Sequence, residues 1–138
     1  MEVRRTTTAT PEQVWAALSD LDGWPSWLPT VDTLTRVDAD RPHEVGAEYV
    51  LKQPKLPKAR WVITRWEPGR RFDWTSRAPG VTSVATHTLT PTDGGGTEIV
   101  LTFDWRGPFS GLTRLMWGRL AKQYVETEAA SLAERAEA

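Results

Sequence analysis

The chain of 138 residues contains no cysteine and only two histidines, His43 and His87. Without cysteine, disulfide bonds, thiolate catalysis and cysteine-ligated metals are all excluded. The two histidines stand far apart in the sequence, and no HxxxH or HxxE spacing is present. We therefore expect neither a metal site nor a bound cofactor.

An excess of charge of one sign is also missing, as is any long apolar run. The chain carries 17 Lys and Arg against 18 Asp and Glu, and this balance gives no long-range attraction to nucleic acid or to an anionic membrane. No apolar segment approaches the ~20 residues of a membrane span, and the N-terminus lacks the apolar core of a signal peptide. These absences predict a cytoplasmic protein with no membrane span and no nucleic-acid partner, folded as one domain over residues 1–138.

Tryptophan, in contrast, is abundant, with eight residues against two Tyr and three Phe. Because each indole can bury about 150–250 Å², the eight can form a core or line a large apolar cavity. The stretch DGWPSWLPTV at 22–31 places Trp24 and Trp27 among prolines. It is interpreted as a lid over a ligand, a stacking platform for nucleic acid or a plug in the core, and the balanced charge argues against the platform.

The order of elements follows from caps and periodicity. Residues 2–8 are rich in β-branched side chains, which is typical of a strand. Thr10, Pro11 and Gln13 match a capping box and predict the start of a helix. Alternation of apolar and polar residues then predicts strands at 32–37, 47–52, 59–66, 71–77, 83–89 and 97–105.

The last segment, residues 109–137, shows apolar residues at helical spacing. The stripe consists of Leu112, Leu115, Met116, Leu120, Tyr124 and Leu132. Short links between the strands favour an antiparallel meander, and its apolar face needs the long helix as a cover. We therefore predict an α+β fold in which a curved antiparallel sheet of six to seven strands grips a long C-terminal helix. Since a twisted sheet cannot pack everywhere against one rod, space should remain between them.

Several stretches along the chain form a familiar set: PEQVWAALSD at 11–20, WPSWLP at 24–29, Val45-Gly46, WEPGRRFDW at 66–74, Leu89-Thr90-Pro91 and Gly95-Gly96-Thr97. Together they resemble the SRPBCC superfamily, the START-like and Bet v 1-like helix-grip proteins, and in particular its bacterial polyketide cyclase/dehydrase-like branch. The resemblance covers the whole chain and implies a cavity for a lipid-, polyketide- or aromatic-like molecule. It also implies two short helices between the first two strands, the second at residues 24–29. We expect Trp27 there to be the inward plug, with Trp24 nearer the rim.

The expected ligand contacts come from the inward face of the sheet, from the helix stripe and from the plug. They are Trp27, Trp61, Ile63, Arg65, Trp74, Ala85, His87, Leu101, Phe103, Met116, Leu120 and Tyr124. The register around Trp61 and Trp66 stays open, because both faces of that strand carry aromatic residues.

Few polar residues are candidates for chemistry. His87 shares the inward face with Ala85 and Leu89, so it is either a general acid/base or a core histidine held by one hydrogen bond. Arg65 and Arg119 could hold a ligand carbonyl or carboxylate, or lie in solvent. The basic stretch at 52–60 is either a solvated loop at the pocket mouth or a contact for a phosphate or an acidic partner.

Three functions remain open. The first is binding of a hydrophobic small molecule in the cavity, by a monomer or a homodimer. The second is a polyketide cyclase/dehydrase-like enzyme with His87 as acid/base and an arginine or Tyr124 at an enolate oxygen. The third is a protein-partner module, which predicts a filled cavity and an exposed apolar patch instead.

Overall fold

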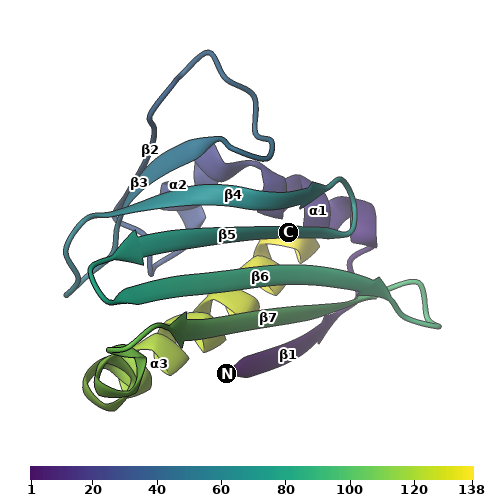
Figure 1. Ribbon diagram of the computed structural model, residues 1–138. Coiled ribbons are helices and arrows are strands. Elements are labelled where there is room, and N and C mark those ends of the chain that lie inside the picture. Colours follow the sequence, from purple (N-terminus) through teal and green to yellow (C-terminus); the bar gives the residue numbers. More distant parts are fainter.

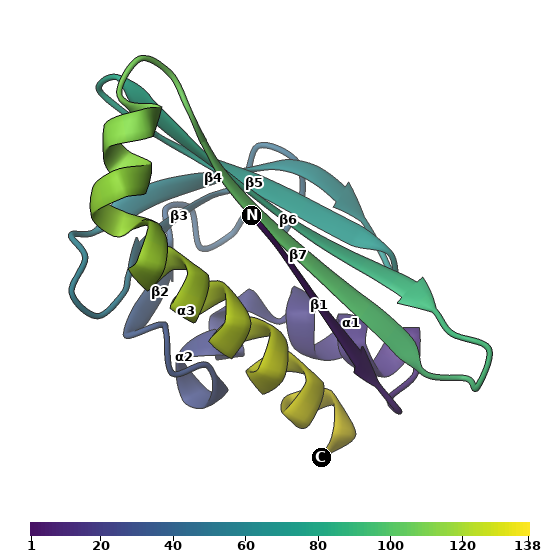
Figure 2. The same cartoon turned by 90° about the horizontal axis from the view of Figure 1, so that it is seen from below.

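The computed structural model describes all residues, 1–138, as a curved seven-stranded antiparallel sheet with three helices on one face (Figures 1 and 2). The strand order is β1-β7-β6-β5-β4-β3-β2. The elements are β1 (Glu2–Thr7), α1 (Pro11–Ser19), a 3-10 turn (Leu21–Gly23), α2 (Trp24–Trp27), β2 (Thr33–Arg36), β3 (Glu48–Lys52), β4 (Ala59–Glu67), β5 (Arg71–Ala78), β6 (Val81–Pro91), β7 (Thr97–Arg106) and α3 (Ser110–Glu137). The predicted helix-grip architecture is confirmed.

The predicted capping box starts α1. The Gln13 amide donates to Thr10 Oγ1 at 3.2 Å, and the Thr10 amide donates to Gln13 Oε1 at 2.8 Å. Pro11 occupies the first turn, where its missing N–H costs nothing. The helix then buries Val14 and Leu18 against the core.

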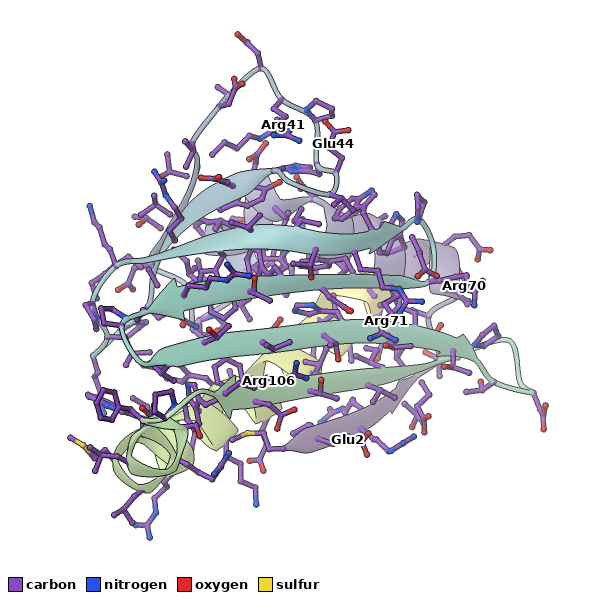
Figure 3. The ribbon with its side chains drawn as sticks, viewed as in Figure 1. Glu2, Arg41, Glu44, Arg70, Arg71 and Arg106 are labelled. Carbon is purple, nitrogen blue, oxygen red and sulfur yellow. The ribbon has the colours of Figure 1, made fainter.

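The sheet separates an apolar inner face from a polar outer face. Figure 3 looks onto the outer face, where Arg71 of β5 lies. Its guanidinium donates two hydrogen bonds of 2.9 Å to the carboxylate of Asp73. Phe72 and Trp74, which alternate with these two residues, are buried on the inner face.

A β-bulge in β4 resolves the register around Trp61 and Trp66. Ile63 pairs with Trp74, but the register shifts before Arg65, so that Trp66 pairs with Phe72. The extra residue turns aromatic side chains inward on both sides of the bulge. The prediction that Arg65 shares the face of Trp61 and Ile63 is wrong, because the bulge places it on the outer face, paired with Glu67.

The long helix α3 is buried along its C-terminal half only. Val125, Ala129, Leu132, Ala133 and Ala136 are buried where α3 packs against β1, β7 and α1. Small alanine side chains let the helix approach the sheet closely there. The N-terminal members of the predicted stripe are different: Leu112, Leu115 and Met116 are exposed. Of the predicted stripe, only Leu132 is among the buried residues of α3, so the packing surface of the helix differs from the predicted one.

Candidate functional site

A cavity of about 420 Å³ lies between the inner face of the sheet and α3. Of its 26 lining residues, 18 are hydrophobic, so the space is apolar with a few polar groups. The aromatic part of the wall consists of Trp24, Trp61, Trp74, Phe103, Trp105, Trp117 and Tyr124. The polar part consists of Thr30, Gln53, Ser76, Ser83, His87, Thr113 and Glu128.

Trp24 of α2 closes the deep end of the cavity. Its side chain is only 2% exposed, and its Nε1–H donates to the Leu18 carbonyl at 3.0 Å. Ring centroids of Trp74 and His87 lie 5.5 and 6.1 Å away. The prediction that Trp27 is the inward plug and Trp24 the rim residue is wrong. Trp24 can be buried completely because the end of α1 offers an acceptor for its N–H, whereas Trp27 is half-buried.

Flat aromatic rings form the sheet side of the wall. The centroid of Trp61 lies 5.2 Å from that of Trp74 and 6.3 Å from that of Phe103, which in turn lies 5.1 Å from Trp105. These distances are typical of packed aromatic pairs, which hold one another in fixed orientations. The wall is therefore a rigid apolar surface.

His87 and Glu128 join the sheet to the helix at the deep end. His87 is 3% exposed and stacks on Phe72 with a centroid distance of 4.1 Å. Its Nδ1 lies 3.0 Å from the Phe72 carbonyl oxygen, and its Nε2 lies 3.0 Å from Glu128 Oε1. Both His87 and Glu128 line the cavity.

These two hydrogen bonds fix the number of protons in the pair. The Phe72 carbonyl can only accept, so His87 Nδ1 carries a hydrogen. The Nε2 contact is then a hydrogen bond only if an imidazolium donates to a carboxylate or a carboxylic acid donates to an imidazole. Either way, the pair holds one proton more than a neutral imidazole beside a carboxylate would.

Thr30 places an unsatisfied hydroxyl in the same wall. The residue is 4% exposed, and its Oγ1 is the one buried side-chain polar atom of the chain without a hydrogen-bond partner. Burying a hydroxyl without a partner costs about 1–3 kcal/mol. Such a cost is explained when a bound molecule supplies the missing partner.

The cavity opens at the end of the sheet where α3 begins. The β3–β4 loop contributes Leu56 and Pro57 to the wall, and the Tyr124 hydroxyl of α3 donates to the Pro54 carbonyl of that loop. On the other side, the Phe109 amide donates to the Gly80 carbonyl at 3.0 Å and ties the start of α3 to the β5–β6 turn. The mouth is thus framed by α3, one loop and one turn.

Seven of the predicted ligand-contact residues lie in the cavity wall: Trp61, Trp74, Ala85, His87, Phe103, Leu120 and Tyr124. Ile63 and Leu101 are instead buried in the core beneath it, while Trp27, Arg65 and Met116 do not reach it. Arg119 is exposed as well, and the Tyr124 proton is donated to Pro54. Neither the predicted arginine nor the predicted tyrosine therefore offers a free hydrogen-bond donor to an enolate oxygen in the cavity.

The sequence analysis missed Trp24, Thr30 and Glu128 as wall residues. The i,i+3 spacing of Trp24 and Trp27 does not show which of the two indole N–H groups has a hydrogen-bond acceptor, and that acceptor decides which ring is buried. Glu128 carries no signal in the sequence, since a glutamate on a helix surface is ordinarily solvated. Only the contact with His87, 41 residues away in the sequence, reveals its place.

A second polar cluster lies outside the cavity, around His43 in the β2–β3 connection. Arg36 donates to His43 Nε2 at 3.1 Å, and His43 Nδ1 lies 2.5 Å from the Tyr49 hydroxyl. Burial and, secondarily, the Arg36 guanidinium lower the pKa of His43, and burial raises the pKa of Tyr49 to about 12. Asp22 pairs with the same Arg36 and ties this connection to the turn before α2. The cluster is a structural clamp.

Residues 1–137 match the sequence model of the family described as "Polyketide cyclase / dehydrase and lipid transport". The chain belongs to this family. The structure adds the helix-grip fold, a cavity of about 420 Å³ and a His–Glu pair in its wall. None of the curated proteins has a sequence that matches the chain.

Solved structures similar to this polyketide cyclase/dehydrase family member share the fold over almost the whole chain. The protein TTHA0849 of Thermus thermophilus is 26% identical, with a TM-score of 0.76 over 99% of this chain and 95% of its own. The Zhui aromatase/cyclase of Streptomyces sp. R1128 is 18% identical, with a TM-score of 0.80 over 99% and 92%. Ara h 8.0201 is 15% identical, with a TM-score of 0.76 over 99% and 95%. None of the helices of this family member is long and apolar enough to cross a membrane.

The lowered pKa of His43 predicts how stability depends on pH. Between the unfolded value of 6.5 and the lower folded value, the unfolded chain binds a proton that the folded chain does not. The free energy of unfolding should therefore fall as the pH drops below about 6.5. Urea unfolding at about pH 7.5 and pH 5 should show a smaller loss in His43→Gln than in the unmodified chain. Equal losses in the two proteins would contradict the assignment.

Proposed function

We propose that this protein binds a hydrophobic small molecule in the cavity between the sheet and α3. The observation that carries the proposal is the open apolar space of about 420 Å³, which lies in the range of small-molecule sites. Protein interiors are otherwise packed to crystal density, so a void of this size has lost many favourable contacts. A ligand would restore them.

The wall favours a flat, aromatic or polycyclic ligand with at least one oxygen. Trp61, Trp74 and Phe103 offer rigid apolar faces against which a planar ring system can pack. In the polar part of the wall, Thr30 Oγ1 needs a partner, and the proton of the His87–Glu128 pair can be shared with an acceptor. A carbonyl or phenol oxygen satisfies both requirements.

The open cavity also bears on the partner-module alternative. That alternative predicts a filled cavity together with an exposed apolar patch. The chain does expose apolar residues at the start of α3, but its cavity is open. Ligand binding therefore accounts for a feature that a partner module alone leaves unexplained.

Replacement of Thr30 by valine tests the ligand site with two effects of opposite sign. Thr30→Val keeps the shape but removes the unsatisfied hydroxyl, so the free energy of unfolding should stay equal or rise by up to about 1 kcal/mol. The affinity for an oxygenated polycyclic probe, followed by tryptophan fluorescence, should in contrast fall about tenfold.

The matched probe without the oxygen should bind both proteins alike. A flat fluorescence response across aromatic, steroid-like and acyl-chain probes would contradict cavity binding itself. A loss of stability in Thr30→Val together with unchanged probe affinity would show that the hydroxyl has a structural role only.

A second candidate function is acid–base catalysis on a carbonyl-bearing ligand, as in a polyketide cyclase/dehydrase. The His87–Glu128 pair supports it, because a proton shared by two groups of the cavity wall can reach a ligand. In a dehydration, the pair can accept a proton from the carbon next to a ketone while it gives up the proton that it already holds. As the carbon–carbon double bond forms, the β carbon–oxygen bond breaks, and a proton from the pair lets the hydroxyl leave as water.

Glu128→Gln tests this candidate, because glutamine keeps the shape but holds no exchangeable acid proton. If the pair is catalytic, turnover of a β-hydroxy ketone polyketide mimic should fall by about 10²–10⁴-fold. Probe affinity and the urea midpoint should change little. His87→Gln should give the same loss and shift the pH profile of the residual rate. Equal turnover in both variants and in the unmodified protein would contradict the catalytic role of the pair and leave ligand binding as the remaining candidate.

A further inference from the structure

The N-cap residue and the first two turns of α3 expose an unusual run of large apolar side chains, which we call the apolar face of α3. Its members are Phe109, Leu112, Leu115, Met116 and Trp117. Leu115 is 83% exposed and Met116 65%. Surface apolar residues normally occur singly, so five within nine residues mark an interaction surface.

This face lies beside the cavity mouth. Thr113 and Trp117 of the same turns reach into the cavity wall, together with Leu56 and Pro57 of the β3–β4 loop. Figures 1 and 2 both place the start of α3 at the end of the molecule where that loop and the β5–β6 turn lie. Whatever covers the apolar face therefore also covers the route into the cavity.

Charge is strongly asymmetric around this mouth. The segments that frame it, residues 53–60, 76–83 and 105–125, contain eight of the 17 Lys and Arg and none of the 18 Asp and Glu. Of the carboxylates next to these segments, Asp104 is paired with the N-terminal amine, Glu48 is paired with Arg60, and Glu126 directly follows the third segment. Arg114, Arg119 and Lys122 on the helix have no carboxylate partner. The net charge of -1 conceals a cationic mouth on an otherwise anionic molecule.

We infer that the apolar face of α3 docks on an anionic lipid surface and that the cavity exchanges its ligand with that surface. Leu, Met, Phe and Trp side chains flanked by Lys and Arg match helices that lie in a bilayer interface. Negative headgroups attract the cationic mouth and repel the anionic remainder, so that the protein is oriented with its mouth toward the lipid. The exchange of ligand rests on the proposed function, whereas docking does not.

A second copy of the chain fits this face less well. A symmetric dimer through the apolar face would bring the Arg114, Arg119 and Lys122 set of one copy against the same set of the other. Like charges facing each other oppose such an interface. The side chains of the apolar face also protrude singly from a convex helix, a shape that fits between lipid molecules better than it fits the flat surface of a protein partner.

The absence of cysteine allows a direct test with single labels. Leu115→Cys carries a polarity-sensitive fluorophore on the apolar face, and Asp93→Cys carries the same label on the exposed β6–β7 turn at the far end of the sheet. With vesicles of phosphatidylglycerol and phosphatidylcholine, the label at 115 should shift to the blue and the label at 93 should not. Salt at about 1 M, where the screening length is ~3 Å instead of ~10 Å at 0.1 M, should weaken vesicle binding at least about tenfold.

Leu115→Ser/Met116→Ser should lose vesicle binding about tenfold or more while keeping its urea midpoint and its probe affinity in solution. The inference would be overturned if the emission of the label at 115 did not shift with vesicles, or if the labels at 115 and 93 shifted equally. It would also be overturned by an emission shift that appears without vesicles and grows with protein concentration, because that result would indicate self-association. Vesicle binding without probe binding would support docking and overturn the proposed ligand site. Probe binding without vesicle binding would support the ligand site and overturn docking.

Discussion

The cavity depends on one constraint: a straight helix cannot follow a strongly curved sheet along its whole length. The C-terminal half of α3 settles against β1, β7 and α1 through Ala129, Ala133 and Ala136, whose small side chains allow close approach. Further toward its start, the same helix stands away from the sheet, and the space of about 420 Å³ opens there. The gap is kept open at its mouth by two ties, from Tyr124 to the β3–β4 loop and from Phe109 to Gly80.

The two ends of this space differ in chemistry because different elements close them. At the deep end, Trp24 is locked by its hydrogen bond to Leu18, and the His87–Glu128 pair links sheet to helix. Trp24 and His87 are buried and Glu128 is half-buried, and their hydrogen bonds hold them in place, as ligand recognition requires. At the mouth, the apolar face of α3 and unpaired cations are exposed to solvent. One end is therefore suited to holding a ligand and the other to admitting it.

The fold was largely predictable because its signals are local. The Thr10 capping box, the Gly- and Pro-rich turns and the strand alternation each specify an element within a few residues, and the strand boundaries agree with the structure to within about two residues. The bulge in β4 was not predictable, since alternation cannot say where an extra residue is inserted. This one irregularity decided the side of Arg65 and let Trp61 and Trp66 share a face.

The site was only partly predictable because it depends on contacts between distant segments. Inward strand positions such as Trp74 and His87 followed from a period of two. The choice of Trp24 over Trp27 depended on an acceptor in another helix, and the role of Glu128 depended on the position of α3 over β6. Balanced total charge likewise hid the cationic mouth, because its three segments are separated in the sequence and meet only in the fold.

The central claim is that the space under α3 is a binding site, and native mass spectrometry of freshly purified protein tests it most directly. The account predicts a population heavier than the chain by the mass of a small hydrophobic molecule, which is released when the protein unfolds. If only the mass of the empty chain appears, even after incubation with a broad set of oxygenated aromatic and lipid-like compounds, the cavity is not a ligand site and the account is wrong.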